Sequence, residues 1–159
     1  MEGEISILKA RSGDIPTLVN FNLKMAQETE GRELDPQILL AGVRGIFENP
    51  NRGFYLVAIV GHEVVGSLMI TTEWSDWRNA DFWWVQSVYV LPEFRRKGVF
   101  GMLYEAVREM AKHEEGVCGC RLYVEKDNTA ARAVYLRRGF RETPYRLLED
   151  CFALMSDGD

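Results

Sequence analysis

The stretch that decides the fold is VYVLPEFRRKGVFG, residues 88–101. It continues a strand-like pattern over residues 82–90, which Leu91-Pro92 closes, and it opens a helical pattern that runs to about residue 113. A short basic turn, RRKG, lies between the two elements. A strand, a tight turn and a helix bring free backbone N–H groups and the positive end of a helix dipole to one point. That point suits a phosphate or pyrophosphate.

The residue types in this turn favour an anionic ligand. Gly98 and Gly101 have no Cβ, so a ligand can approach the main chain closely, and three basic side chains add mobile positive charge. An ordinary helix start with basic surface residues is the alternative. The chain lacks the Gly-Lys-Ser/Thr ending of a P-loop and the third glycine of a dinucleotide fingerprint. The candidate phosphate contacts are Arg95, Arg96, Lys97, Gly98, Val99, Phe100 and Gly101.

The flanking sequence extends this unit into an α/β pattern. Helix starts are signalled by Asp14 with Pro16 and by Asp35 with Pro36, and a helix end by Gly31. The order β-α-α-β-β-β-α-β-α-β-β indicates a mixed sheet with helices on both faces, in a single domain over residues 1–159. The expected elements are a strand at 5–10, helices at 15–28 and 36–48, strands at 54–60, 64–72 and 82–90, a helix at 99–113, a strand at 120–125, a helix at 129–138, and strands at 140–145 and 148–155.

Composition excludes several classes of function. With 159 residues, 47% of them hydrophobic, the chain can bury a core without disulfides or metal. A net charge of -5 argues against general nucleic-acid binding, and no apolar run approaches the length of a membrane span. The three cysteines are odd in number and lack zinc-knuckle spacing. We therefore expect reduced thiols in a cytoplasmic protein that has no metal, no nucleic-acid partner and no membrane association.

A second motif, NTAARAVYLRRGF at residues 128–140, follows the basic turn. With both motifs in place, most of the chain resembles the GNAT family of N-acetyltransferases. The family pattern is Gln/Arg-x-x-Gly-x-Gly/Ala, then Asn-x-x-Ala-x-x-x-Tyr-x-x-x-Gly-Phe. Phe100 departs from it, because a small residue is usual there, although Gly101 follows directly. The matching residues are Arg95, Gly98, Asn128, Ala131, Tyr135, Gly139 and Phe140.

The resemblance implies a GNAT-like α/β (α+β) fold, with a mixed, mostly antiparallel sheet of six to seven strands and helices on both faces. It also implies an acetyl-CoA-dependent N-acetyltransferase in which the amine attacks the thioester directly in a ternary complex. In the family, the fourth strand pairs with the pantetheine arm of the cofactor, and a backbone N–H near its end polarises the thioester carbonyl. These contacts map to Val88, Tyr89 and Val90.

The resemblance assigns two further residues. Tyr135 would protonate the departing CoA thiolate, and Asn128 would bind the cofactor through its side chain or an ordered water. A packed aromatic on an amphipathic helix is the alternative role for Tyr135. The resemblance also implies a homodimer, because exposed C-terminal strand edges invite pairing.

A general base must accept the proton of the substrate ammonium. Glu73 is the first candidate, with Asp76 and Asp81 as alternatives and Gln86 as a group that positions water. For each acidic residue, a solvated loop carboxylate is the competing interpretation. The two histidines, His62 in a turn and His113 at a helix end, are expected at the surface.

The acceptor is predicted from the aromatic segment WSDWRNADFWW, residues 74–84. Strand alternation buries some of these rings, and the others could line a pocket where aromatic faces and carboxylates favour a cationic amine. The segment is loosely similar to the polyamine and thialysine acetyltransferase branch of the family. We predict a small-molecule amine substrate. A protein or peptide N-acetyltransferase and a non-catalytic acyl-CoA-binding domain are the alternatives.

Overall fold

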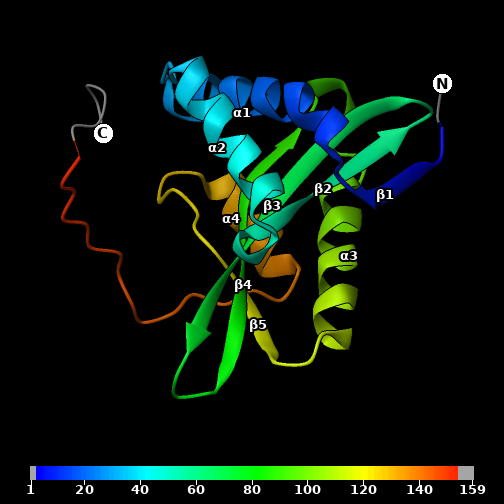
Figure 1. The fold of residues 1–159 in the computed structure, drawn as a ribbon. Helices are drawn as coiled ribbons and strands as arrows, with labels where there is room; N and C mark the ends of the chain where they lie inside the picture. The colour runs from blue at the N-terminus through cyan, green and yellow to red at the C-terminus, as the bar shows by residue number, and fades with distance from the viewer. Residues whose placement is uncertain (1–2, 154–159) are drawn as a thin grey trace. The chain divides into compact units, whose positions relative to one another are not determined.

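The structure is a computed structural model that describes residues 3–153. The chain forms two compact units, one through Tyr123 and one from Val124 onward (Figure 1). Within the described residues, no helix is both long and apolar enough to cross a membrane. The first unit contains β1 (Ile5–Lys9), η1 (Ser12–Asp14), α1 (Ile15–Glu30), α2 (Pro36–Glu48), η2 (Pro50–Arg52), β2 (Gly53–Val60), β3 (Glu63–Ser75), β4 (Ala80–Val90), η3 (Pro92–Phe94), α3 (Val99–His113) and β5 (Val117–Leu122). The second unit contains α4 (Thr129–Arg137).

The sheet of the first unit follows chain order, β1-β2-β3-β4-β5. Its first four strands are antiparallel neighbours, and β5 joins β4 in parallel after the crossover through α3. The mixed, mostly antiparallel sheet is therefore confirmed. Gly61 closes the β2–β3 hairpin with φ of 62°, a left-handed conformation that glycine adopts without strain.

Helices cover both faces of this sheet, as expected. Val57 of β2 packs with Leu18 of α1 and Val43 of α2, so these helices share one face. Val57 pairs with Ser67, so Gly66 points to the other face, where a Cβ would lie 3.0 Å from Val99 of α3. The sheet thus separates α1 and α2 from α3. The core fills both sides.

Local signals for the helix boundaries are confirmed. Asp35 Oδ1 accepts hydrogen bonds from the N–H groups of Gln37 (2.8 Å) and Ile38 (3.4 Å) and caps α2. Gly31 ends α1 with φ of 63°. Asp14 precedes α1 as expected, but its carboxylate accepts from the Arg11 N–H at 2.8 Å instead of capping the helix.

The boundaries of three strands, β3, β4 and β5, differ from the prediction. β3 and β4 continue pairing as far as Ser75 and Ala80, beyond the strands expected at 64–72 and 82–90. Two exposed strands need no apolar face to pair, because their pairing depends on hydrogen bonds between backbone groups, so polar residues can belong to them. β5 covers Val117–Leu122, about three residues earlier than predicted.

The prediction of six to seven strands is also wrong. The sheet has five strands within residues 3–153, and neither predicted C-terminal strand forms among residues 140–153. Residues 154 and 155 of the last predicted strand lie outside the described residues. Strand-like composition favours extended backbone, but a strand also needs a hydrogen-bonding neighbour. Here residues 141–153 form neither a helix nor a strand (Figure 1). Leu148 is 90% exposed and Phe152 is 93% exposed.

Candidate functional site

The free edge of β4 is the first component of the candidate site. β4 pairs with β5 only over residues 81–85, because β5 ends at Leu122, yet β4 continues to Val90. The Leu91 N–H donates to the Val65 carbonyl of β3 at 2.8 Å. Peptide groups alternate in direction along a strand, so those of Val90 point away from β3. Residues 86–90 therefore present an edge that an extended ligand can pair with.

A β-bulge lies within this free segment. On β3, one residue separates Ser67 from Met69, while two residues separate their partners on β4, Tyr89 and Gln86. One of the two, Ser87, has φ of 51°, which is uncommon for a residue other than glycine. A bulge increases strand twist and changes the direction of the backbone that follows, as often happens beside active sites. The bulge thus sets the orientation of the β4 edge.

The basic turn lies between η3 and α3. Arg96 has φ of 62° and Gly98 has φ of 79°, so two left-handed residues turn the chain into the helix. Gly98 is the N-cap, and no side chain among the described residues caps α3. The first intrahelical bond runs from Met102 N–H to the Gly98 carbonyl at 3.0 Å, which leaves the first turn's amides without helical acceptors. This geometry fits the predicted anion site.

Phe100, the departure from the family pattern, does not block the turn. Its ring stacks along α3 on that of Tyr104, with centroids 6.0 Å apart and an interplanar angle of 11°. Val99 is buried beside it. The bulk of Phe100 is therefore directed along the helix.

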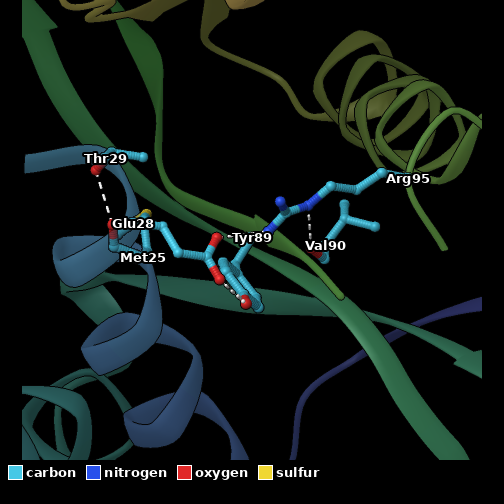
Figure 2. A network of polar contacts seen from close by, with 6 residues as sticks. All are labelled: Met25, Glu28, Thr29, Tyr89, Val90 and Arg95. Atoms are coloured by element: carbon cyan, nitrogen blue, oxygen red, sulfur yellow. Dashed lines mark hydrogen bonds and ion pairs between the residues drawn. The ribbon is translucent and has the colours of Figure 1, made fainter. Parts of the chain in front are cut away.

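A polar network joins α1 to this region (Figure 2). The Glu28 carboxylate accepts from Tyr89 Oη at 2.8 Å and from Arg95 Nη2 at 2.6 Å. Arg95 Nε also donates to the Val90 carbonyl at 2.9 Å. The Arg95 hydrogen bond is the main cause that lowers the pKa of Glu28, so this carboxylate stays ionised at neutral pH. The sequence gives no signal for Glu28, because its partners are 61 and 67 residues away.

A wide surface cleft of about 470 Å³ borders the same helix. It is lined by Phe21 and Lys24 of α1, by the β2–β3 turn and by Leu91 at the end of β4. Its lining is largely polar and open to solvent. The free edge of β4, unlike this cleft, offers a row of peptide groups that an extended ligand can pair with, so the candidate site lies there.

The predicted base Glu73 lies on β3, with its carboxylate already engaged. Glu73 Oε1 accepts from Arg121 Nη1 at 2.7 Å and from Trp84 Nε1 at 3.4 Å. Glu73 pairs with Phe82, four residues before Gln86, which places its backbone about 13 Å along the strand from the start of the free edge. Gln86 lies at that start and donates to Thr71 Oγ1 at 2.7 Å.

The other base candidates lie elsewhere. Asp76 is exposed in the β3–β4 turn, where its carboxylate accepts from the Trp77 N–H at 2.9 Å. Asp81 lies near the start of β4 and pairs with Val117. Neither is adjacent in register to the free edge of β4.

The aromatic segment divides between core and surface. Trp83 is buried and packs edge-on against Phe54. Trp84 faces the side of α1 and α2 and contacts Tyr123, with ring centroids 4.4 Å apart. Arg121 lies on the Phe82 ring, 3.6 Å from its centroid. Trp84, Tyr123 and Phe82 therefore form an aromatic surface that also carries the Glu73–Arg121 ion pair.

The second unit carries the two remaining predicted residues. Asn128 Oδ1 accepts from the Ala131 N–H at 3.1 Å and caps α4, as the sequence predicts for a helix start. Tyr135 lies on α4 with its ring edge-on to Phe140, and burial raises its pKa. A raised pKa keeps the phenol protonated at neutral pH, as a proton donor requires.

Comparison with known proteins identifies the family. The model of the Acetyltransferase (GNAT) family matches residues 17–140, more than half of the chain. The chain belongs to the GNAT family of acetyltransferases. Among curated proteins, no relative matches it.

Solved structures support this membership. A possible acetyltransferase from Clostridium difficile 630 is 42% identical and has a TM-score of 0.88, with 94% of this chain and 99% of that chain covered. A predicted acetyltransferase with acetyl-CoA from Clostridium acetobutylicum is 20% identical, with a TM-score of 0.76 and 92% and 96% covered. The aminoglycoside acetyltransferase AAC(6')-Iy with a bisubstrate analogue is 18% identical, with a TM-score of 0.75 and 95% and 100% covered. At these lower identities the likeness is one of fold.

In this GNAT chain, the predicted cofactor residues Val88, Tyr89 and Val90 fall on the free edge of β4, and the basic turn follows within the same unit. Within residues 3–153, no group of three or more His, Cys, Asp and Glu side chains could hold a metal ion. The polar groups beside the free edge of β4 are the Glu28 network and the basic turn before α3.

Proposed function

We propose that this GNAT protein transfers the acetyl group of acetyl-CoA to a primary amine of a small molecule. The observation that carries the proposal is the free edge of β4, which η3 and the basic turn connect to a start of α3 that no described side chain caps. An extended arm with amide groups can pair with residues 88–90 while its pyrophosphate binds the amides of the next turn. Coenzyme A has these two features in this order. Arg96 and Lys97 are exposed and supply positive charge.

The chemistry follows from the same edge. The Val90 N–H points to the open side of β4, where it would donate to the thioester oxygen as negative charge develops there. The amine nitrogen attacks the carbonyl carbon, the carbon–sulfur bond breaks, and the thiolate leaves with its electron pair. We propose that Tyr135 gives its proton to that thiolate, and that Asn128 contributes to cofactor binding. Burial keeps the Tyr135 phenol protonated for this step.

The proton of the substrate ammonium must leave before attack. Glu73 was the first candidate from sequence, but its carboxylate is held by Arg121 and Trp84. Gln86 lies where β4 and β5 separate, and its amide can orient a water beside the thioester. We therefore favour water positioned by Gln86 over Glu73 as the proton acceptor.

The small-molecule acceptor is supported by the aromatic side chains of Trp84 and Tyr123, because aromatic faces attract a cationic amine. Similarity in fold to AAC(6')-Iy makes aminoglycosides one class to include among trial substrates. A protein or peptide acceptor and a non-catalytic acyl-CoA-binding role are the alternatives.

We further propose a single functional domain, since the family match crosses the boundary between the two compact units. Exposed apolar residues after α4, including Leu148 and Phe152, support the prediction of a homodimer. The free thiols Cys118, Cys120 and Cys151 support a reducing compartment such as the cytoplasm. Sedimentation of the purified chain would test the dimer. A monomer at micromolar concentration would contradict it.

The test of function is calorimetric titration with acetyl-CoA, followed by a thiol-release assay with polyamines, amino acids, aminoglycosides and peptides. Binding with turnover on one small-amine class supports the proposal. Turnover only on peptides would favour the protein acetyltransferase, and binding without turnover would favour the non-catalytic domain. No binding of acetyl-CoA would refute the assignment of the β4 edge and the basic turn.

A further inference from the structure

The Arg95 side chain makes contacts that differ from those of a phosphate ligand. Its Nε donates to the Val90 carbonyl at 2.9 Å, and its Nη2 forms an ion pair with Glu28 at 2.6 Å. The guanidinium also lies over the Tyr89 ring, 5.4 Å from the centroid. Two of the five guanidinium N–H donors therefore bind α1 and β4, and the charge is paired with Glu28 (Figure 2).

The contacts of Arg95 connect three elements that border the proposed cofactor edge. Glu28 lies in the last turns of α1, Val90 ends β4, and Arg95 belongs to the turn that leads into α3. Tyr89 makes a second contact between β4 and α1. Its hydroxyl donates to the same Glu28 carboxylate, and its ring packs on Phe21 of α1. The Glu28 carboxylate of α1 thus binds side chains from both the end of β4 and the basic turn.

We infer that Arg95 is a positioning residue that holds the free edge of β4 against α1 through Val90 and Glu28, and that it is not a ligand of the cofactor's phosphates. This inference rests on the proposed function. It gives the residues of the basic turn two different roles. Arg96 and Lys97 are exposed, and their positive charges would offset the negative charge of the pyrophosphate. Arg95 fixes the carbonyl beside which the pantetheine arm would pair.

The two roles predict opposite effects of changing Glu28. If Arg95 binds phosphate, Glu28 competes for it, so Glu28→Gln frees a cation and tightens coenzyme A binding. If Arg95 positions the edge, Glu28→Gln and Arg95→Gln weaken binding together, and the double variant is no weaker than either single one. Arg95→Lys also separates the roles, because an ammonium keeps the charge but cannot donate in a fixed fork to Val90 and Glu28.

The experiment is calorimetric titration of coenzyme A at several salt concentrations. It uses the wild type, Glu28→Gln, Arg95→Gln, Arg95→Lys, the double variant Glu28→Gln/Arg95→Gln, and Glu30→Gln as a control. Glu30 ends the same helix and forms an ion pair with Arg32 at 3.6 Å. We expect each single variant at Glu28 or Arg95 to weaken coenzyme A binding about threefold or more, and the double variant to bind no more weakly than either single one. The salt dependence of binding should stay that of the wild type. The control should bind as the wild type.

Tighter binding by Glu28→Gln, additive losses, near-complete rescue by Arg95→Lys, or a shallower salt dependence in Arg95→Gln would overturn the inference. Tyr89→Phe provides a milder variant that keeps the ring packing if Arg95→Gln folds poorly, and it should weaken binding in the same direction. Hydrogen exchange without coenzyme A separates this test from that of the proposed function. Arg95→Gln should speed amide exchange in the last turn of α1 even if the wild type binds no coenzyme A, and unchanged exchange there would overturn the inference.

Discussion

Glu73 and Arg121 lie on strands that flank β4, and their side chains meet across it at 2.7 Å. The Arg121 guanidinium rests at the same time on the Phe82 ring between them. An engaged carboxylate at this distance from the free edge of β4 is poorly placed to accept the substrate's proton. It is better placed to shape the surface on which an acceptor would lie.

We therefore predict that Glu73→Gln preserves the pH dependence of kcat, whereas Gln86→Leu lowers kcat about tenfold or more by releasing the positioned water. Initial-rate measurements between pH 6 and 9 check both variants. Thr72→Ala, on the opposite face of β3, is the matched control and should retain wild-type kinetics. A pH dependence of kcat that changes in Glu73→Gln would restore Glu73 as the base.

Tyr135→Phe should lower kcat about 100-fold, because it removes the proposed proton donor, while leaving the Kd of acetyl-CoA unchanged. Burial raises the pKa of Tyr135 above its ordinary value of 10.0, so wild-type activity should fall only as pH rises beyond that value. Steady-state kinetics and calorimetry measure the two quantities. Tyr145→Phe, at a largely exposed tyrosine of the same unit, is the control. An unchanged rate in Tyr135→Phe would exclude the acid role.

Arg96→Gln and Lys97→Gln should each weaken coenzyme A binding about threefold to tenfold at low salt, because each removes a cation beside the uncapped start of α3. The loss should shrink as salt concentration rises. Titration at two ionic strengths measures it. Lys112→Gln, in the last turn of the same helix, changes the net charge equally and should bind normally. An equal loss in Lys112→Gln would mean that only overall charge matters.

Glu28 should make stability depend on pH. Its pKa is lowered from 4.5, chiefly by the Arg95 hydrogen bond, so its stabilising contribution is present above pH 4.5 and disappears as pH falls through the lowered value. Both side chains are more than one-third exposed, so the contribution at pH 7 is below about 1 kcal/mol. Urea unfolding of wild type and Glu28→Gln at pH 7 and pH 3 measures the difference. A difference that grows at pH 3 would contradict this sign.

Gly53→Ala should destabilise the first unit by about 3 kcal/mol, because an added Cβ would overlap the Ile70 carbonyl oxygen and Gly53 has φ of 147°. Thermal or urea unfolding checks this value. Gly13→Ala is the control, since a Cβ there meets no atom within 4 Å. Equal stability of the two variants would show that β2 can shift away from β3 at its first residue.

Much of the fold could be predicted from sequence because its signals are local. The cap at Asp35, the left-handed end at Gly31, the turn at Gly61 and the start of α4 at Asn128 each depend on residues within one turn of chain. The basic turn at residues 95–98 could be placed for the same reason, and with the second motif it indicated the family. These features depend on backbone conformation and helix ends, which short stretches of sequence determine.

Tertiary structure decided the rest. The sequence could not show that β5 ends early enough to free β4 after Val85, that Arg121 engages Glu73, or that residues 140–153 form no strand. Nor could it show that Glu28 binds Arg95 from 67 residues away. Such contacts depend on how strands align and where helices pack, and they produce no periodic pattern in the sequence. The sequence by itself therefore determined the family and the place of the basic turn, because its signals are local, while the packing of α1 on β4 decided which groups Arg95 contacts.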